Sequence, residues 1–389
     1  MSNETQPEIR FLGFTEAWEE RKLGEVVESV GTGRSTFTNG IVQTSETPYA
    51  VLGSTSVISY DSMFDHSGDF ILTARVGANA GNLYKYFGEV KISDNTVYIQ
   101  ANNLDFIYYL LTKYNLKRLS FGTGQPLVKA SEVKNLKLNF PQKNEEQQKI
   151  GTFFKQLDDT IALHQRKLDL LKETKKGFLQ KMFPKNGAKV PEIRFPGFTE
   201  DWEERKLGQV ANYRRGSFPQ PYGNKEWYDG ENSMPFVQVV DVGDNLRLVE
   251  DTKQKISELA QPKSVFVEEG KVVVTLQGSI GRVAITQYPA YVDRTLLIFE
   301  SYKAEMDEYY FAYVIQQLFE YEKTRAPGGT IKTITKEALS NFTISFPSIA
   351  EQKKLGKFFE QLDDTIALHQ RKLDLLKETK KGFLQKMFV

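Results

Sequence analysis

The feature of this sequence that most constrains its fold is an internal repeat. Residues 156–183 return at 361–388 without a single change, shifted by 205 positions. A second block, residues 7–26, returns at 191–210 with three substitutions and a shift of 184 positions. A repeat of this length and identity indicates that one structural unit occurs twice in the chain.

The segments between the repeated blocks are the variable part of the chain. Because the two shifts differ, residues 27–139 and 211–345, here called the first and second body, are unequal in length. A chain of 389 residues with 40% hydrophobic and 26% charged residues predicts at least two folded domains. The expected organisation is a first domain with its N-terminal frame at 1–145, a helix at 146–183, a linker at 184–190, a second domain at 191–345 and a helix at 346–389.

The long repeated segments carry a heptad pattern of apolar residues, which is typical of a coiled coil. From Glu146 to Met182 the first copy would be about 55 Å long as a helix. An isolated heptad pattern would equally suit a packed amphipathic helix, but two identical copies favour antiparallel pairing around an approximate twofold axis. Full overlap would place Phe154 opposite Phe383. The predicted seam consists of Ile150, Phe154, Leu157, Ile161, His164, Leu168, Leu171 and Phe178 with Leu355, Phe359, Leu362, Ile366, His369, Leu373, Leu376 and Phe383.

Both bodies have the same predicted order of strands followed by one helix, so the expected fold class is α+β. The first body has predicted strands at 47–59, 69–76, 82–87 and 96–100 and a helix at about 104–118. The second body has predicted strands at 236–242, 271–277, 282–287 and 295–299 and a helix at about 307–323. Gly-rich turns at 76–82 and 277–282 precede the tripeptides Asp-Asn-Thr (94–96) and Asp-Arg-Thr (293–295), which we align with each other.

The composition excludes several kinds of chemistry. The chain has no cysteine, which excludes disulfides, thiolate metal sites and cysteine nucleophiles. Its three histidines, His66, His164 and His369, are too few for a histidine metal site or a Ser-His-Asp triad to be expected. The Phe-Gly-Thr-Gly segment at 121–124 lacks the strand and spacing of a cofactor loop. We therefore expect neither catalytic residues nor a metal site in this chain.

Charge and hydropathy say less about partners. The 51 basic and 50 acidic residues give a net charge of +1, which neither requires nor excludes a polyanionic partner. No run of about 18 apolar residues is present, and the first residues lack a basic segment followed by an apolar one. We therefore expect no membrane span and no signal peptide, and a cytoplasmic location.

Short motifs at fixed places carry a resemblance to a known family. Each body ends in Phe-Pro, which is followed by Glu-Gln-Gln-Lys-Ile (146–150) or Glu-Gln-Lys-Lys-Leu (351–355), and then by Leu-Asp-Asp-Thr-Ile inside the repeated helix. With this combination of motifs, the chain resembles the specificity subunit of a type I restriction-modification system. The resemblance covers nearly the whole chain.

The resemblance implies a function and a set of partners. In such a subunit each body is a target recognition domain that reads one half of a bipartite sequence in double-stranded DNA, and the helices separate the bodies and bind partner chains. Two modification (methyltransferase) subunits and two restriction (translocase and nuclease) subunits are implied as partners. S-adenosylmethionine, ATP and Mg are expected in those partners and not in this chain, which would not itself be an enzyme.

Candidate DNA contacts are the Arg, Lys, Asn, Gln and Ser residues in and near the Gly-rich turns, because such side chains read base edges and anchor phosphates. In the first body they are Arg34, Arg75, Asn79, Asn82, Lys85, Gln125 and Lys129. In the second body they are Arg214, Arg215, Gln277, Ser279, Arg282, Arg294, Arg325 and Lys332. The alternative is a scaffold that holds two protein-binding bodies on a coiled-coil rod, which would be indifferent to DNA and salt.

Overall fold

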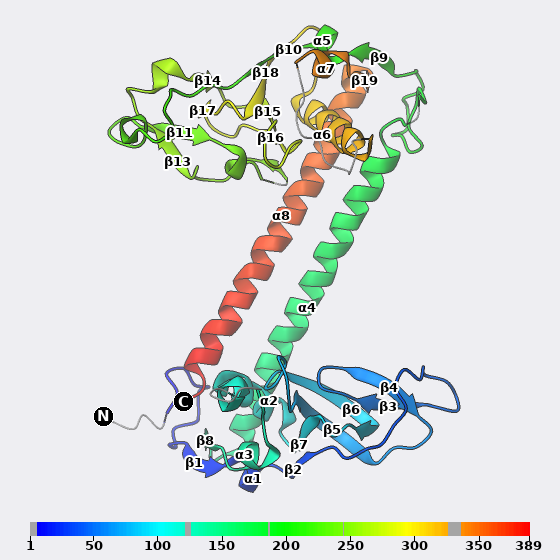
Figure 1. The fold of residues 1–389 in the computed structure, drawn as a ribbon, viewed down its shortest axis with the longest axis vertical. Coiled ribbons are helices and arrows are strands. Elements are labelled where there is room, and N and C mark those ends of the chain that lie inside the picture. Colours follow the sequence, from blue (N-terminus) through cyan, green and yellow to red (C-terminus); the bar gives the residue numbers. More distant parts are fainter. Residues whose placement is uncertain (1–5, 121–125, 186, 244, 326–335) are drawn as a thin grey trace. The chain divides into compact units, whose positions relative to one another are not determined.

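The computed structural model describes residues 6–120, 126–185, 187–243, 245–325 and 336–389. The chain forms two compact units (Figure 1). The first consists of Met1–Gln165 and Lys372–Val389, and the second of Arg166–Arg371. Each unit therefore combines one body with part of both long helices.

The first unit contains a six-stranded sheet next to a short two-stranded one. The strand order in the large sheet is β2-β7-β5-β6-β3-β4, and the pairs are antiparallel except for β3 with β6. Its strands are β2 (Ser29–Thr32), β3 (Tyr49–Leu52), β4 (Val57–Asp61), β5 (His66–Ala74), β6 (Leu83–Ile92) and β7 (Thr96–Gln100). In the small sheet, β1 (Glu19–Lys22) pairs with β8 (Lys137–Phe140).

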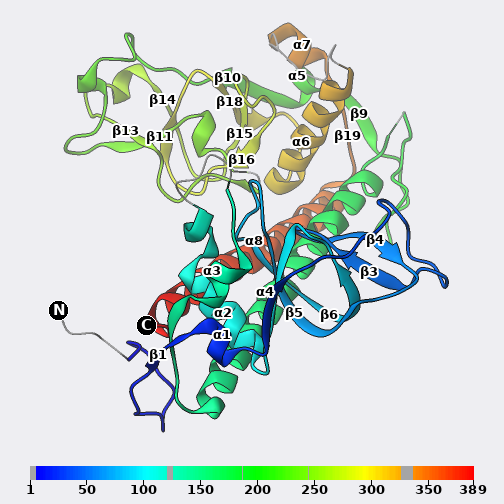
Figure 2. The same cartoon turned by 60° about the horizontal axis from the view of Figure 1, so that its bottom comes forward.

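The helices of the first unit cover one face of the large sheet. Besides parts of the two long helices, they are α1 (Leu23–Val26), α2 (Leu104–Tyr114), the 3₁₀ helix Leu116–Ser120 and α3 (Ala130–Lys134). Residues alternate along β5, so that Ile71 packs in the core with α2 while Phe70 and Leu72 lie in a second apolar cluster. Helix α2 is capped by the following residue Asn115, whose φ of 63° is left-handed. Figure 2 shows α2 lying against the start of α4.

The second unit repeats the small sheet but has two larger ones. In the small sheet β9 (Glu203–Lys206) pairs with β19 (Thr343–Phe346). One large sheet has the order β10 (Ala211–Arg215), β18 (Leu296–Tyr302), β15 (Val272–Thr275), β16 (Val283–Ile285) and β12 (Leu246–Arg247). The other has the order β13 (Gln254–Ile256), β11 (Met234–Val237), β17 (Ala290–Val292) and β14 (Val265–Val267).

Strand β15 lies between two layers of the second unit and is buried on both faces. Val272 and Val274 pack toward the core that contains α6 (Glu308–Arg325), and Val273 packs in the cluster formed with the other large sheet. This explains the continuous apolar run in its sequence. The unit also contains α5 (Leu207–Val210), α7 (Lys336–Asn341) and the 3₁₀ helices Lys225–Trp227, Val239–Asp241 and Gln261–Lys263.

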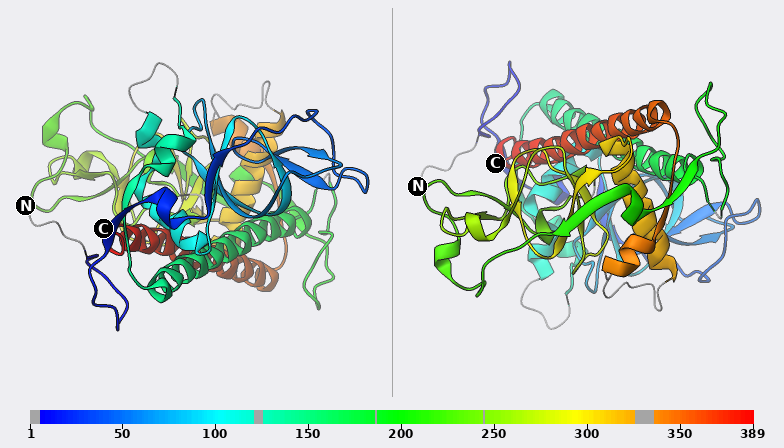
Figure 3. Two further views of the ribbon diagram at one scale, coloured as in Figure 1. Left: turned by 90° about the horizontal axis from the view of Figure 1, so that it is seen from below. Right: turned by 90° about the horizontal axis from the view of Figure 1, so that it is seen from above.

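The long helices are α4 (Asn144–Lys181) and α8 (Ile349–Lys386), each of 38 residues. In the first unit the beginning of α4 packs against the end of α8, and in the second unit the end of α4 packs against the beginning of α8. Figure 3 shows α6 beside the first turns of α8. The predicted fold class, two α+β bodies with two long antiparallel helices and an internal pseudo-twofold repeat, is confirmed.

Several predicted strands differ from the observed ones. The strand expected at 47–59 is a hairpin of β3 and β4, closed by a hydrogen bond from Gly53 N to Ser56 O of 2.9 Å. The strand expected at 236–242 stops at Val237, because the Asp241 carboxylate accepts the backbone N–H of Gln238 and starts a 3₁₀ turn. The strand expected at 82–87 continues to Ile92, and the helix expected at 104–118 ends at Tyr114.

Candidate nucleic-acid interface

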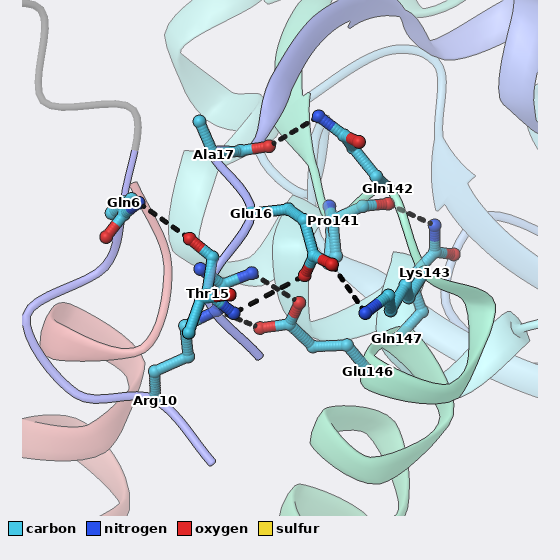
Figure 4. A network of polar contacts seen from close by, with 10 residues as sticks. All are labelled: Gln6, Arg10, Thr15, Glu16, Ala17, Pro141, Gln142, Lys143, Glu146 and Gln147. Atoms are coloured by element: carbon cyan, nitrogen blue, oxygen red, sulfur yellow. Dashed lines mark hydrogen bonds and ion pairs between the residues drawn. The ribbon is translucent and has the colours of Figure 1, made fainter. Parts of the chain in front are cut away.

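The two frames, which are the repeated blocks at residues 7–26 and 191–210, dock onto the long helices through identical buried ion pairs. Arg10 Nε and Nη2 lie 2.6 and 2.8 Å from the Glu146 carboxylate oxygens, and Arg194 makes the same two bonds to Glu351 at 2.8 and 2.7 Å. Both glutamate side chains are only 1% exposed. The hydrogen bonds to these carboxylates raise the pKa of Arg10 and of Arg194. Figure 4 shows the first of the two pairs.

The glutamine after each buried glutamate ties the long helix to the body. Gln147 donates to Pro141 O at 3.2 Å and accepts from Asn103 Nδ2 at 3.1 Å. Gln352 donates to Pro347 O at 2.9 Å and accepts from the backbone N of Asp307 at 3.1 Å. The Glu-Gln motif therefore joins the frame, the Phe-Pro segment and the residues before α2 or α6.

An exposed pair completes the network of the first frame (Figure 4). Lys143 Nζ lies 2.5 Å from a Glu16 carboxylate oxygen. The hydrogen bond from Lys143 lowers the pKa of Glu16 to about 2.

A polar layer links each body to both long helices. Asp158 of α4 accepts from the Tyr109 hydroxyl at 2.7 Å and pairs with Lys380 of α8 at 2.5 Å. In the second unit Asp363 accepts from the Tyr313 hydroxyl and pairs with Lys175 at 2.6 Å. Burial, and next the neighbouring aspartate, raise the pKa of Tyr109 and Tyr313. Because the same layer occurs twice, it fixes the same pairing of the helices in both units.

The predicted seam residues are all buried or half-buried. Those that are buried are Ile150, Phe154, Leu168, Leu355, Phe359 and Leu373; the rest, including His164 and His369, are half-buried. The predicted partner of Phe383 is displaced by one residue, since its ring centroid lies 5.1 Å from that of Phe153. Phe154 instead packs against Phe388, with ring centroids 5.7 Å apart.

The Gly-rich turns of each body meet other loops at one end of the sheet. In the first unit Gly33 N donates to Thr96 O at 3.0 Å, Arg75 N to Asn95 O at 2.9 Å, and Val128 N to Arg75 O at 2.7 Å. In the second unit Gly216 N donates to Leu296 O at 3.1 Å and Leu276 N to Thr295 O at 2.8 Å. We call these the two loop surfaces. They are formed by residues 33–35, 75–82, 93–96 and 126–129, and by residues 216–222, 276–282 and 293–296.

A glycine in each loop surface allows the chain to approach the following helical segment closely. Gly81 and Gly281 both have a φ of 84°. A Cβ atom would lie 2.5 Å from Lys117 N at Gly81 and 2.7 Å from Phe319 Cβ at Gly281. Only glycine fits this conformation and this approach.

These hydrogen bonds correct the predicted alignment of the two tripeptides. Residues 93–96 occupy the place of residues 293–296, since Thr96 N donates to Ser93 O as Leu296 N donates to Asp293 O. The counterpart of Asp293 is therefore Ser93 and not Asp94, and Arg294 corresponds to Asp94.

The candidates of the first body fall into three groups. Arg34, Arg75, Asn79, Asn82 and Lys129 lie on the loop surface, where Lys129 pairs with Glu132 at 3.2 Å. Lys85 lies within the strand β6, where its Nζ is 2.6 Å from Asp105 and above the Tyr108 ring. Gln125 lies outside the described residues.

The candidates of the second body are also divided. Gln277, Ser279 and Arg294 are exposed on the loop surface, and Arg282 there is half-buried. Arg214 and Arg215 are exposed residues of β10, with Arg214 3.8 Å from Glu300. The side chain of Arg325 and all of Lys332 lie outside the described residues.

Sequence reasoning found Arg294 but missed the other polar residues that line a hollow beside the second loop surface. This hollow has a volume of about 370 Å³, and its polar lining includes Tyr222, Gln238, Lys253 and Gln254 together with Arg294. These residues come from four separate segments, so no local pattern in the sequence groups them into one site. Among the residues that the structure describes, no group of His, Asp and Glu side chains could hold a metal ion.

Comparison with known proteins places the chain in a family. The family model of the type I restriction modification DNA specificity domain matches residues 15–173 and 199–378. The chain therefore belongs to the family of type I restriction-modification specificity proteins. One curated relative is the type I restriction enzyme MjaVIII specificity subunit of Methanocaldococcus jannaschii, 23% identical over 203 residues. That match covers 52% of this chain and 44% of the relative, so the chain spans less than half of that protein.

Solved structures share the fold. The type I restriction-modification S subunit from M. genitalium has a TM-score of 0.69 and 16% identity, with 99% of both chains covered. A chain from a study of complex assembly and conformational transition in a type I system has a TM-score of 0.54 and 20% identity, covering 97% of this chain and 99% of that one. In the described part of this chain, no helix is both long and apolar enough to cross a membrane.

Proposed function

We propose that this chain selects the DNA target of a type I restriction-modification complex, with each body reading one half of a bipartite sequence. The observation that carries the proposal is the duplicated loop surface. The same backbone hydrogen bonds form it in both bodies, on frames that dock through the same ion pairs. A common scaffold that presents different side chains is what independent reading of two half-sites requires.

The side chains on the two loop surfaces differ in charge as well as in identity. Where the first body has Ser93 and Asp94, the second has Asp293 and Arg294. Because arginine favours guanine edges and an acid favours the amino group of cytosine, this exchange supports different half-sites for the two bodies.

The repeated helices supply two equal surfaces for partner chains. Leu163 and Leu170 are 60% and 67% exposed, and their copies Leu368 and Leu375 are 61% and 63% exposed. Seven-residue spacing puts each pair on one helix face outside the seam. Exposed leucines in an identical pair of sites suit two copies of one partner, and we assign them to two modification subunits. Two restriction subunits would join the same complex, and the partners would supply S-adenosylmethionine, ATP and Mg.

The first experiment tests DNA reading. The chain is produced with the modification subunit of its own system in a host without other methylation, and the methylated adenines are mapped. We expect one bipartite motif, and we expect DNA binding by the purified complex to weaken steeply as salt rises. A complex indifferent to DNA and salt would favour the scaffold alternative.

The second experiment tests partner docking. The double substitution Leu163→Glu and Leu368→Glu puts a charge on each exposed leucine face, and native mass measurement counts the bound modification subunits. We expect two per wild-type chain and none per variant. The matched control is Lys172→Glu with Lys377→Glu, which changes charge on another side of the same helices. Two subunits bound to the leucine variant would contradict the assignment.

A further inference from the structure

The hollow of the second unit lies next to residues 293–296 of its loop surface. Its polar lining consists of Tyr222, Gln238, Lys253, Gln254, Asp293, Arg294 and Thr295. The cationic ones, Lys253 and Arg294, are exposed, Asp293 is buried, and the others are half-buried. Four chain segments therefore bring hydrogen-bonding side chains to one small concave surface.

A buried aspartate organises one side of this hollow. Asp241 is 1% exposed. Its Oδ2 atom accepts the backbone N–H of Gln238 at 2.7 Å, and its Oδ1 atom accepts that of Lys253 at 2.9 Å. One carboxylate thus fixes the backbone of two lining residues that are 15 positions apart in sequence.

A second buried aspartate organises the other side. Asp293 is 2% exposed. It accepts the Thr295 backbone N–H at 2.9 Å and the Tyr222 hydroxyl at 2.6 Å. The guanidinium carbon of Arg294 lies 4.9 Å from the centre of the Tyr222 ring. The carboxylate therefore holds both the turn that carries Arg294 and the ring on which Arg294 rests.

The charges of the hollow favour an acceptor-rich ligand. Both aspartates are buried and use their oxygens for internal donors, whereas the two lysine and arginine cations are exposed. A guanidinium on an aromatic face keeps its planar donor edge in a fixed orientation, which suits the paired O6 and N7 acceptors of guanine. Donors whose positions are fixed before binding discriminate better than mobile ones.

We infer that this hollow reads a guanine-containing step of the half-site recognised by the second body. Arg294 contacts the guanine edge, Lys253 adds a second donor, and Asp241 and Asp293 are positioning residues. The inference rests on the proposed function and deepens it. The first body has Asp94 at the place of Arg294, so the contact belongs to one half-site only.

The experiment maps methylated adenines in hosts that carry the complex with Arg294→Ala in this chain. The expected result is a loss of preference of roughly tenfold or more at one G·C pair of one half-site, with the other half-site unchanged. Arg294→Lys keeps the charge but not the planar donor edge, and it should lose the same preference. The control is Lys225→Ala, an exposed cation of the same body outside the hollow, which should leave the motif as it is.

The positioning residues have their own test. Asp293→Asn and Tyr222→Phe should weaken the preference at the same base pair as Arg294→Ala, with the preference in the other half-site unchanged. A merely structural role would lower the melting temperature and reduce methylation at all sites without changing the preference. Should a variant lose all methylation, selection of bound duplexes from a randomised pool by the purified complex reads the same preference.

The outcomes separate this inference from the proposed function. A wild-type complex that methylates no bipartite motif would overturn both. A wild-type bipartite motif that Arg294→Ala and Arg294→Lys leave unchanged would overturn the hollow alone. A loosened preference in both half-sites would also overturn it, because the contact would then not belong to one body.

Discussion

At the scale of single residues, the recurring device is a buried carboxylate whose oxygens all accept hydrogen bonds. Glu146 and Glu351 bind the frame arginines, and Asp241 and Asp293 bind the loops of the second body. A buried charge is stable only when it is paired or hydrogen-bonded. Each of these groups therefore fixes the chain segments that supply its donors.

The frame ion pair should be costly to break from one side. Arg10→Ala leaves the buried Glu146 carboxylate without its partner, so we expect a loss of about 3 to 5 kcal/mol in the free energy of unfolding. Arg194→Ala should cost the same, because the Glu351 contacts are the same. Urea unfolding of the purified chain measures both. The control Lys143→Ala removes only the exposed pair with Glu16 and should cost less than about 1 kcal/mol; equal losses in all three variants would contradict this account.

Glu308 should make stability depend on pH. Burial raises its pKa above the ordinary value of 4.5, although the hydrogen bond from the Tyr302 hydroxyl acts in the opposite direction. A carboxyl group whose pKa is raised by folding stabilises the native state at low pH, and that stabilisation is lost as pH rises through the folded pKa. Glu308→Gln cannot ionise, and its amide oxygen can still accept from Tyr302. We expect the variant to be more stable than wild type at pH 7.

The measurement is urea unfolding of both proteins across a pH series. Their difference should shrink as pH falls toward and below 4.5, where the carboxyl is protonated in the folded and the unfolded chain. A difference in stability that is constant with pH, or a less stable variant at pH 7, would contradict a raised pKa of Glu308 in the folded protein.

At the scale of elements, the paired helices combine an apolar seam with one polar layer in each unit. Leu168 is 1% exposed, whereas Leu163 on the same helix is 60% exposed. Leu168→Ala should therefore cost about 2 to 5 kcal/mol, and Leu163→Ala less than about 0.5 kcal/mol. Urea unfolding of the two variants compares them directly. Similar losses in the free energy of unfolding would contradict the burial of Leu168 and the exposure of Leu163.

The helices could be predicted from sequence better than the strands. The heptads of α4 and α8 are long and periodic, so their ends were found within a few residues. Strand β11 was predicted too long because the Asp241 side chain, and not apolar content, decides where the strand stops. The two tripeptides were misaligned by one residue because identical letters were matched, while the backbone hydrogen bonds equate Ser93 with Asp293.

The candidate site was predictable only in part, because the sequence reveals turns but not the contacts between distant segments. Gly-rich turns can be recognised from sequence, and Arg34, Arg75 and Arg294 were therefore found on the loop surfaces. Lys85 lies outside the loop surface, and its pairing with Asp105, 20 residues away, forms only in the fold. The lining of the hollow depends on two buried aspartates whose contacts span several segments, and no local pattern reveals such contacts.

At the scale of the whole molecule, the end of a repeated helix makes the same contacts with the frame in each unit. In the first unit Ile9 N donates to Lys386 O at 3.0 Å, and Phe388 packs against Trp18. In the second unit Ile193 N donates to Lys181 O at 2.9 Å, and Phe183 packs against Trp202. The end of one repeated helix thus completes the unit that holds the other body. The frames supply these contacts, which leaves the bodies free to differ.

The central claim, that each body reads its own half-site on a common frame, is tested most directly by exchanging one body. Residues 27–139 are replaced by the corresponding body of another family member, and the methylated motif of the assembled complex is mapped. The frame contacts of Arg10, Trp18 and Glu146 lie outside the exchanged segment and are kept. We predict that one half of the motif changes to that of the donor while the other half stays as in the wild type. A change in both halves, or in neither, would contradict the account.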